Sequence, residues 1–307
     1  MNHLPFDELR RRCQKPGYRC LGNWMARRVT RPAALHLTRI VAPWGISANL
    51  ATLTALGCGV AAACCFAWAT PWGWILGAVL LQSWYLLDHV DGQLARLRGT
   101  ASLDGVQLDY LMHHTINLLV PLGVGAGLFG RSAEPIWLIV GLVCGLSLLV
   151  ITLQHDARYK AFIQRLKRVE GRLEVIGGGG GRPEPQPPVP RTPSRLLAWT
   201  ARKTCEIHVI ANLLALAALG QLILGDERLV AGSACLAVIT AAAVAVACWS
   251  VLYSQHSGAA EREFAAWFRP RPGEQIVFLD GWWCVREEKT NPASSPPPEK
   301  SNNPIQG

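Results

Sequence analysis

Six apolar segments dominate the hydrophobic pattern of the chain, and polar or charged connections separate them. The segments cover residues 50–68, 71–87, 111–130, 135–153, 207–224 and 229–253. Each is close to the roughly 17 to 25 residues that a helix needs to cross a bilayer. Because backbone in lipid must satisfy its own hydrogen bonds, segments of this length are expected to be helical. The pattern predicts an all-α integral membrane bundle of six transmembrane helices.

Glycines inside the predicted spans indicate where the helices approach one another. Small residues let helix backbones come close in a membrane, and this packing role needs no catalytic function. The candidates for close approach are Gly57, Gly123, Gly127, Gly141 and Gly145.

The residues before the first apolar segment predict a helix that lies on the membrane surface. Over residues 21–48, arginines alternate with Leu, Ile, Val and Trp at helical intervals, with breaks expected at Pro32 and Pro43. Such a helix places its basic side chains on anionic lipid head groups. A solvated charged helix ahead of the membrane is the alternative. No apolar run follows the basic residues at the start of the chain, so a secretory signal peptide is not predicted.

Composition and charge support a membrane protein with a defined orientation. Half of the residues are hydrophobic and the mean hydropathy is positive, which excludes an ordinary soluble domain. The connections on one side hold 28 of the 30 Lys and Arg residues, and those on the other side hold only Arg131 and Arg228. Because positive charge is retained on the cytoplasmic side, both termini are expected in the cytoplasm, with the spans in the cytoplasmic (inner) membrane. No nucleic-acid partner is expected.

The same pattern divides the chain into three parts. Residues 1–48 form a cytoplasmic segment with the amphipathic helix, residues 49–254 the six-span domain, and residues 255–307 a cytoplasmic tail that is disordered after about residue 286. A cytoplasmic linker over residues 155–205 interrupts the six-span domain. Its Gly run and Pro-rich stretch pack poorly as helix or sheet. The ten cysteines show no metal-binding spacing and are expected to be reduced thiols.

Polar residues gather between the second and third apolar segments. Asp88, Asp91, Gly92, Ala95 and Arg96 fall on one face of a helix, since three- and four-residue spacings return to the same side. They form a negative patch floored by small residues. Charge beside a membrane is costly, and ionisable residues there are usually functional.

A second helix carries Gly105, Asp109 and His113 at four-residue intervals, and a short turn would let both helices converge on one pocket. Clustered carboxylates favour a hard divalent cation, Mg²⁺ or Mn²⁺. Two alternatives remain. Asp88 and Asp91 could merely cap or solvate a helix end, with Arg96 as an ordinary cytoplasmic charge. The second alternative is a cation transporter, but a transporter would have its carboxylates spread over several spans. The neighbouring His89 and His114 are expected to face away from this pocket.

The pattern Asp-x2-Asp-Gly-x2-Ala-Arg-x8-Gly-x3-Asp resembles the signature of the CDP-alcohol phosphatidyltransferase family, integral membrane enzymes that make phospholipid head groups. Seven of the eight signature positions match with every spacing intact, and the eighth, an Asp in the family, is His113. A second stretch, GISANLAT at residues 45–52, resembles the family's Pro-Asn-x2-Thr, with Ala48 in place of the proline. The resemblance extends over roughly residues 25–255.

The resemblance implies transfer of a phosphatidyl or other phosphoalcohol group from a CDP-alcohol, such as CDP-diacylglycerol, to an acceptor hydroxyl, with release of CMP. It implies Asp88, Asp91 and Asp109 as ligands of two metal ions, with His113 as a candidate further ligand. It implies substrate contacts at Gly92, Ala95, Arg96, Gly105 and Asn49, with help from Thr52. A helix cap is the alternative role for Asn49.

His113 stands where the family's last Asp is thought to deprotonate the acceptor. Imidazole, with an ordinary pKa of about 6.5, suits a general base, but it cannot supply the missing anion and so favours Mn²⁺ over Mg²⁺.

Three interpretations stay open: an active transferase with a His base, a member with diverged chemistry, and an inactive relative that binds nucleotide or lipid. The acceptor is open among glycerol phosphate, inositol phosphate, serine, choline and a lipid alcohol. Arg158 and Lys160 are candidates for holding an acceptor phosphate. A homodimer is also left open.

The charge distribution makes a direct prediction about topology. A cysteine introduced beside Gly225, between two Lys- and Arg-poor segments, should react with an impermeant reagent added to intact cells, whereas one at Gly179 should not. Labelling in the opposite sense would overturn the orientation with the motif at the cytoplasmic face.

Overall fold

The computed structural model describes residues 5–15, 18, 22–175, 189–226, 228–279 and 282–287. The chain forms two compact units: residues 1–157 with 179–259, and residues 158–178 with 260–307. The Gly and Pro run of the predicted linker, including Gly179, falls mostly on residues 176–188 and so lies outside the described residues, as does the tail after residue 287. The three-part domain division stays a prediction.

The first unit is a bundle of long helices, as expected. Its helices cover the six apolar segments: α3 (Ala48–Ala67), α4 (Pro71–Arg98), α5 (Leu103–Ser132), α6 (Ile136–Arg168, which continues into the second unit), α8 (Ile207–Leu224) and α9 (Val230–Ser257). Five of these are long and apolar enough to cross a membrane, and α4 is not among them. Its predicted span is interrupted by Trp, Tyr, Gln and Gly residues, which lower its mean hydropathy. The chain is an integral multi-pass membrane protein.

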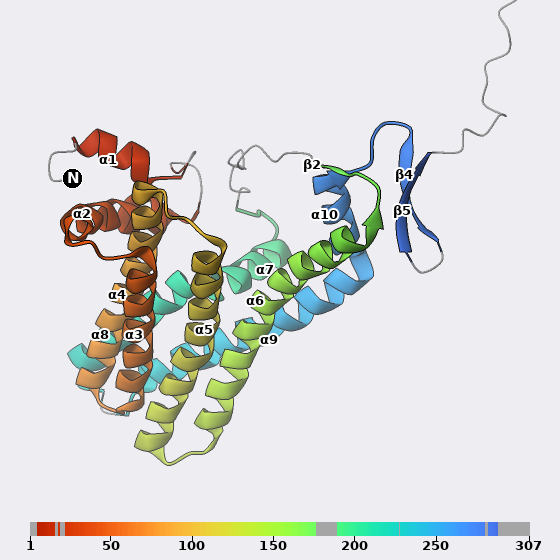
Figure 1. The fold of residues 1–307 in the computed structure, drawn as a ribbon. Coiled ribbons are helices and arrows are strands. Elements are labelled where there is room, and N and C mark those ends of the chain that lie inside the picture. The colour runs from red at the N-terminus through yellow and green to blue at the C-terminus, as the bar shows by residue number, and fades with distance from the viewer. Residues whose placement is uncertain are drawn as a thin grey trace, which may run out of the picture. The chain divides into compact units, whose positions relative to one another are not determined.

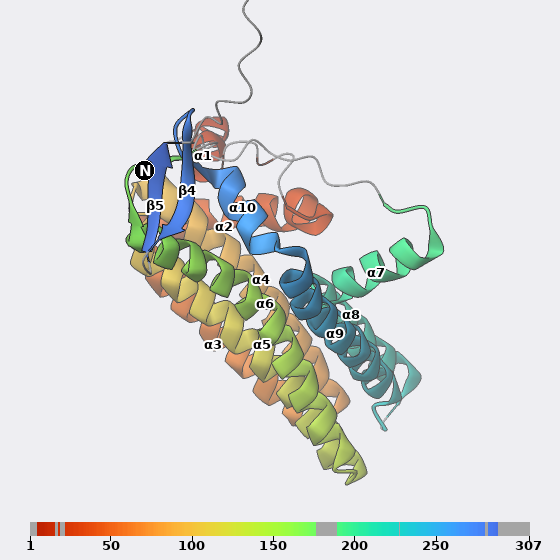
Figure 2. The same ribbon diagram turned by 90° about the vertical axis from the view of Figure 1, so that its right-hand side faces the viewer.

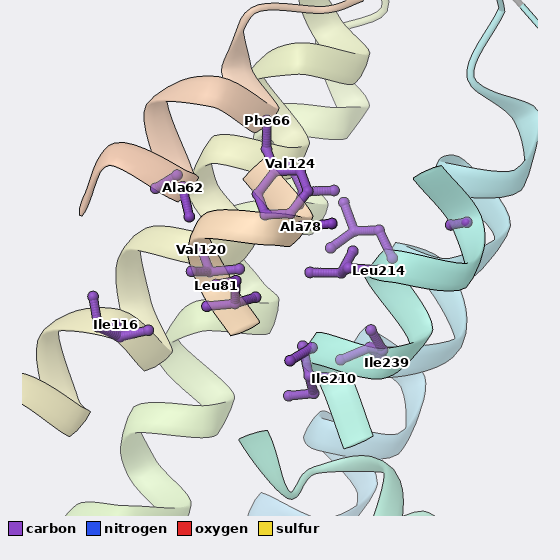
Figure 3. Close-up of a cluster of buried hydrophobic side chains, with 14 of the residues drawn as sticks. Ala62, Phe66, Ala78, Leu81, Ile116, Val120, Val124, Ile210, Leu214 and Ile239 are labelled. Carbon is purple, nitrogen blue, oxygen red and sulfur yellow. The ribbon is translucent and has the colours of Figure 1, made fainter. Parts of the chain in front are cut away.

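The core of the bundle joins all six of these helices, with Cys144 and Leu148 contributed by α6. Figure 3 shows side chains from α3, α4, α5, α8 and α9 gathered in one apolar cluster. Phe66 of α3 meets Trp74 of α4 edge to face, with 5.4 Å between ring centroids. Helix α3 packs along both α4 and α5, so these two helices are held around a common neighbour.

Four of the five predicted glycine contacts are confirmed. A Cβ at Gly123 or Gly127 would lie 2.2 Å or 2.1 Å from a backbone oxygen of α3, and Gly141 and Gly145 approach α5 in the same way. The expectation for Gly57 is wrong, because a Cβ there would meet nothing within 4 Å.

Short helices cover the end of the bundle where α4 finishes (Figures 1 and 2). They are α1 (Phe6–Cys13), the π-helix η1 (Ala26–Thr30), α2 (Arg31–Val41) and the 3₁₀ turn η2 (Ala42–Trp44). The predicted break at Pro32 is wrong. The preceding π-helical turn places the Arg31 N–H on the Ala26 carbonyl, so the missing N–H of Pro32 falls at the start of α2, where proline is tolerated. The break at Pro43 is confirmed by η2 and by Gly45, with φ of 76°.

Side chains of α4 fasten α2 and the loop after it. Gln93, which is buried, accepts a hydrogen bond from the Thr38 hydroxyl at 2.9 Å and donates one to the Arg31 carbonyl at 3.2 Å. Arg98 donates to the Ala42 carbonyl at 2.9 Å and also to the Ile46 carbonyl. Buried polar groups of this kind are costly when unpaired, so these bonds fix α2 against α4. Helix α7 (Pro193–Thr204) completes the first unit.

The second unit contains two small sheets that the hydrophobic pattern did not predict. It contains the end of α6, helix α10 (Ala259–Trp267) and two small sheets, one ordered β1–β5–β4 and the other β2–β3. The strands are β1 (Val169–Glu170), β2 (Glu174–Val175), β3 (Phe268–Arg269), β4 (Glu274–Leu279) and β5 (Trp282–Glu287). Arg165 pairs with Glu261 and lies over the Trp283 ring at 4.1 Å. Arg158 pairs with Glu263 at 2.7 Å. Its charge is therefore already matched, which weakens its case as an acceptor-phosphate ligand.

Replacing Gly127 by alanine should destabilise the bundle. The added methyl group would collide with the Phe66 carbonyl, and overpacking of this kind typically costs about 1–3 kcal/mol. Thermal unfolding of both variants in one detergent measures the effect, with Gly57→Ala as the matched control because its methyl group meets open space. Equal midpoints for the two variants would contradict the close α3–α5 contact.

Candidate active site

The end of α4 and the start of α5 set the spacing of the polar motif. Helix α4 stops at Gly99, whose left-handed conformation (φ 66°) lets the Thr100 N–H donate to the Ala95 carbonyl at 2.9 Å. Helix α5 begins at once, because the Ser102 hydroxyl accepts a hydrogen bond from the Gly105 N–H at 3.1 Å. The eight residues between Arg96 and Gly105 therefore comprise the last two residues of α4, the turn of residues 99–102 and the first two residues of α5.

The motif opens into a cavity of about 200 Å³ in the first unit. Helices α4 and α5 meet here through side chains rather than through close backbone contact, which leaves space between them. The cavity is lined by Gln14, Lys15, Tyr18, Arg31, Asp88, His89, Asp91, Gly92, Gln93, Arg96, Asp109 and His113. All four predicted metal-binding side chains thus reach one space.

Two carboxylates and one imidazole form the centre of this cavity. The His113 Nε2 atom lies 2.9 Å from Asp88 Oδ1 and 3.5 Å from Asp109 Oδ1. One ligand atom from each of the three residues lies within 4.8 Å of the others. The Trp84 ring stands edge-on to the imidazole at 5.4 Å and limits its rotation. Two carboxylate oxygens and one nitrogen suit a divalent cation that accepts mixed ligands.

Asp91 faces the same cavity but does not belong to this three-residue cluster. The Thr52 hydroxyl donates to Asp91 Oδ2 at 2.7 Å, and the Gly92 N–H donates to Oδ1. Asp91 follows the predicted span 71–87, and burial raises the pKa of its carboxyl to about 7. Thr52, expected only to help in substrate binding, instead holds this carboxylate.

Gly92 and Arg96 both line the cavity, and the glycine leaves room for the arginine side chain. A Cβ at Gly92 would lie 3.1 Å from Arg96 Nη1, so the glycine lets the arginine side chain fold back along α4. Arg96 Nε donates to the Cys13 carbonyl at 2.5 Å, at the end of α1. Arg96 therefore braces the N-terminal helix and also lines the cavity.

Three predicted substrate residues lie outside the cavity lining: Ala95, Gly105 and Asn49. Asn49 and Gly105 nevertheless lie near each other, since a Cβ on Gly105 would be 3.4 Å from Asn49 Oδ1. The alternative role of Asn49 as a helix cap is wrong. Ser47 caps α3 by accepting the Leu50 N–H at 3.1 Å, and Asn49 is exposed in the first turn.

Several residues of the cavity were missed by sequence reasoning. Gln14, Lys15 and Tyr18 follow α1. The apolar pattern of that helix is too short to predict it from the sequence. His89 lines the cavity, with Nδ1 3.5 Å from Asp88 Oδ2, so the expectation that it faces away is wrong. The expectation for His114 is confirmed.

His114 belongs to a separate contact with α6. Its Nε2 lies 2.8 Å from Asp156 Oδ2, and its Nδ1 lies 3.2 Å from the Thr152 hydroxyl. Of the nine described cysteines, all are free thiols.

Fold and site together define a multi-pass membrane protein with an acidic cavity at one end of its helix bundle. The model of the CDP-alcohol phosphatidyltransferase family matches residues 46–169, which cover α3 to α6 and the whole motif. This part of the chain is similar to that family.

One solved structure similar to this chain is phosphatidylinositol phosphate synthase from Mycobacterium tuberculosis with CDP-DAG bound. It is 18% identical, the match covers 71% of this chain and 90% of that chain, and the TM-score is 0.44. No curated protein matches the chain.

Proposed function

We propose that this protein transfers a phosphoalcohol group from a CDP-alcohol to an acceptor hydroxyl and releases CMP. One observation carries the proposal: Asp88 of α4 and Asp109 and His113 of α5 converge within 4.8 Å in a cavity that the signature residues Gly92 and Arg96 also line. A chance scatter of polar residues beside a membrane would not bring side chains from two helices together in this way.

Asp88, Asp109 and His113 are the residues that would hold a divalent cation, and Asp91 is the candidate ligand for a second one. A divalent cation supplies stabilisation of negative charge on phosphate oxygens in such a reaction. The nitrogen ligand favours Mn²⁺ relative to the all-oxygen set of the family signature.

His113 is proposed to accept the acceptor's proton. The acceptor oxygen bonds to the phosphorus that carries the alcohol, its proton passes to His113 Nε2, and the bond from phosphorus to the CMP oxygen breaks. Because carboxylates only accept hydrogen bonds, Nε2 carries a hydrogen when it binds Asp88 at 2.9 Å. Proton transfer at this atom therefore requires the neutral tautomer with its hydrogen on Nδ1 and an Nε2 lone pair that binds no cation, so His113 acts either as the base or as a cation ligand, and Asp88 and Asp109 hold the cation when it acts as the base. The Trp84 ring packs against the His113 imidazole whichever nitrogen carries the hydrogen.

The same hydrogen bond favours a second candidate function, an inactive family member that binds nucleotide or lipid. A histidine fixed as a donor between two carboxylates would satisfy their charge without taking part in proton transfer. Variants at His113 separate the two functions.

The setting of the reaction is part of the proposal. Both termini and the motif would face the cytoplasm, where CDP-alcohols are available, and α2 would rest on anionic lipids with Ile40 and Trp44 exposed toward the bilayer.

Changing Asp88 or Asp109 to asparagine should remove Mn²⁺ binding and lower CMP release by at least about 100-fold, because the variant keeps the size and loses the anionic ligand. Asp91→Asn should lower turnover with a smaller effect on Mn²⁺ binding. Electron paramagnetic resonance measures bound Mn²⁺, and CMP release measures turnover. Asp156→Asn is the matched control, since Asp156 pairs with His114 outside the cavity. Near-normal turnover in a cavity variant would remove that residue from the proposed site.

Substitutions at His113 test its role as the base. Glutamine can keep a donor near the position of Nε2 but cannot take a proton, so His113→Gln and His113→Ala should both lose turnover, by at least about 100-fold. His113→Asp should retain turnover and shift the preference toward Mg²⁺, because it restores an anionic oxygen. CMP release in Mg²⁺ and in Mn²⁺ measures each variant.

Two results would count against a catalytic His113. Full activity of the His113→Gln variant would mean that His113 has only a positioning role. An inert wild type beside an active His113→Asp would identify the chain as the inactive family member.

A further inference from the structure

A second hollow lies beside the catalytic cavity, and its charged lining residues are arginines, with no carboxylate among the described ones. This groove, of about 540 Å³, lies between α1, η1 and α2. It is lined by Phe6, Arg10, Gln14, Tyr18, Trp24, Arg27, Arg28, Arg31, Pro32, Leu35 and His36. Four arginines face it, and none of the described lining residues is acidic. The volume is within the roughly 300–1,000 Å³ typical of small-molecule sites.

The four arginines lie close together, and no carboxylate is among the described residues that line the groove. Arg10 lies 3.7 Å from Asp7, but the Asp7 side chain is 87% exposed and is not part of the lining. Burial, with the positive charge of Arg27 nearby, lowers the pKa of Arg31. Like charges in one hollow repel, and a bound anion relieves that repulsion.

The groove and the catalytic cavity share one wall, formed by Gln14, Tyr18 and Arg31. Arg31 Nη1 donates to the Tyr18 carbonyl at 2.7 Å, and the Arg31 carbonyl accepts from the buried Gln93 at 3.2 Å. Gln93 lies on α4 between the signature residues Asp91 and Arg96. The wall is therefore fixed to α4, the helix that carries Asp88 and Asp91.

The remaining lining gives the groove a defined shape. Phe6 and His36 stack with 4.9 Å between ring centroids, and Arg10 lies 5.2 Å from the Phe6 ring centre. Trp24 is 65% exposed and offers a flat apolar side. Guanidinium groups bind phosphate through paired, charge-assisted hydrogen bonds, which a planar fork of donors makes specific.

We infer that this groove is a binding site for a phosphate group, held by Arg10, Arg27, Arg28 and Arg31 beside the catalytic cavity. The phosphate belongs either to a soluble phosphorylated alcohol or to the head group of an anionic phospholipid. The phosphate site itself is independent of the transferase reaction. Assigning it to the acceptor alcohol rests on the proposed function, because the shared wall puts the ligand next to His113 and Asp88.

The test measures binding by the full chain in phosphatidylcholine nanodiscs with no CDP-alcohol present, so that its outcome does not depend on turnover. Glycerol 3-phosphate is titrated by calorimetry, with glycerol as the uncharged comparison. Arg10→Gln/Arg28→Gln should raise the dissociation constant for glycerol 3-phosphate at least about tenfold, because two charge-assisted contacts are lost. Glycerol should not bind measurably.

The matched control is Arg11→Gln/Arg39→Gln, which removes the same charge from α1 and α2. Arg11 pairs with Glu8 at 2.7 Å and Arg39 is exposed, and neither lines the groove. This control should bind glycerol 3-phosphate as wild type does. If the arginines acted only as general positive charge on an anionic leaflet, both double variants would bind glycerol 3-phosphate equally. That result would overturn the proposal that the groove is a binding site.

A second arm identifies the source of the phosphate. The same proteins are extracted from membranes containing phosphatidylglycerol, and the lipid that stays bound is measured by mass spectrometry. Retained phosphatidylglycerol that Arg10→Gln/Arg28→Gln loses and the control keeps assigns the site to a lipid head group. Binding of glycerol 3-phosphate with the same variant pattern assigns it to a soluble alcohol. Absence of both patterns overturns the proposal.

If the ligand is the acceptor, Arg10→Gln/Arg28→Gln should raise KM for a phosphorylated acceptor while KM for the CDP-alcohol stays within about twofold of wild type, since the donor contacts lie at the catalytic carboxylates. A protein that binds glycerol 3-phosphate but releases no CMP would refute the proposed function and leave the phosphate site standing. Active turnover with no phosphate binding would do the reverse.

Discussion

The contact between Asp88 and His113 is the interaction on which the arrangement of the site depends. Carboxylates beside an apolar bundle are costly unless each has a partner, and here the partners come from a different helix. The imidazole satisfies Asp88 and approaches Asp109, and Trp84 supports the ring from α4. Helices α4 and α5 are therefore joined at their polar ends through side chains, while α3 joins them along their apolar length.

Charge is divided between two neighbouring hollows of the first unit. The proposed active-site cavity is lined by Asp88, Asp91 and Asp109 together with Lys15, Arg31 and Arg96, whereas the adjacent groove is lined by four arginines and by no described acidic residue. Gln14, Tyr18 and Arg31 line both hollows and so form their common wall. One end of the bundle therefore holds charged groups of both signs.

Much of the bundle and of the motif could be predicted from the sequence, for identifiable reasons. The apolar segments located every long helix because length and composition in a membrane leave few other structures. The spacing of Asp88, Asp109 and His113 placed them together because helical periodicity is regular. Those signals are local, and each can be measured within one segment.

The features that were missed depend on contacts between distant segments. The cavity wall from α1 could not be foreseen, because Leu9 and Cys13 give too short an apolar pattern and their burial depends on α2 and α4. Gly57 resembles Gly127 in the sequence, and only the position of α5 distinguishes them. His89 is adjacent to Asp88, yet the direction of its ring is set by Tyr85, whose carbonyl lies 3.0 Å from His89 Nδ1. Such features need the tertiary structure.

The hydrogen bonds of Gln93 to Thr38 and Arg31 have a mechanical consequence. They tie α2 to α4, the helix that carries Asp88 and Asp91. A displacement of α2 would then be passed to these carboxylates rather than absorbed by a flexible joint. If α2 rests on the lipid surface as proposed, this coupling gives the composition of the leaflet a physical route to the geometry of the proposed active site.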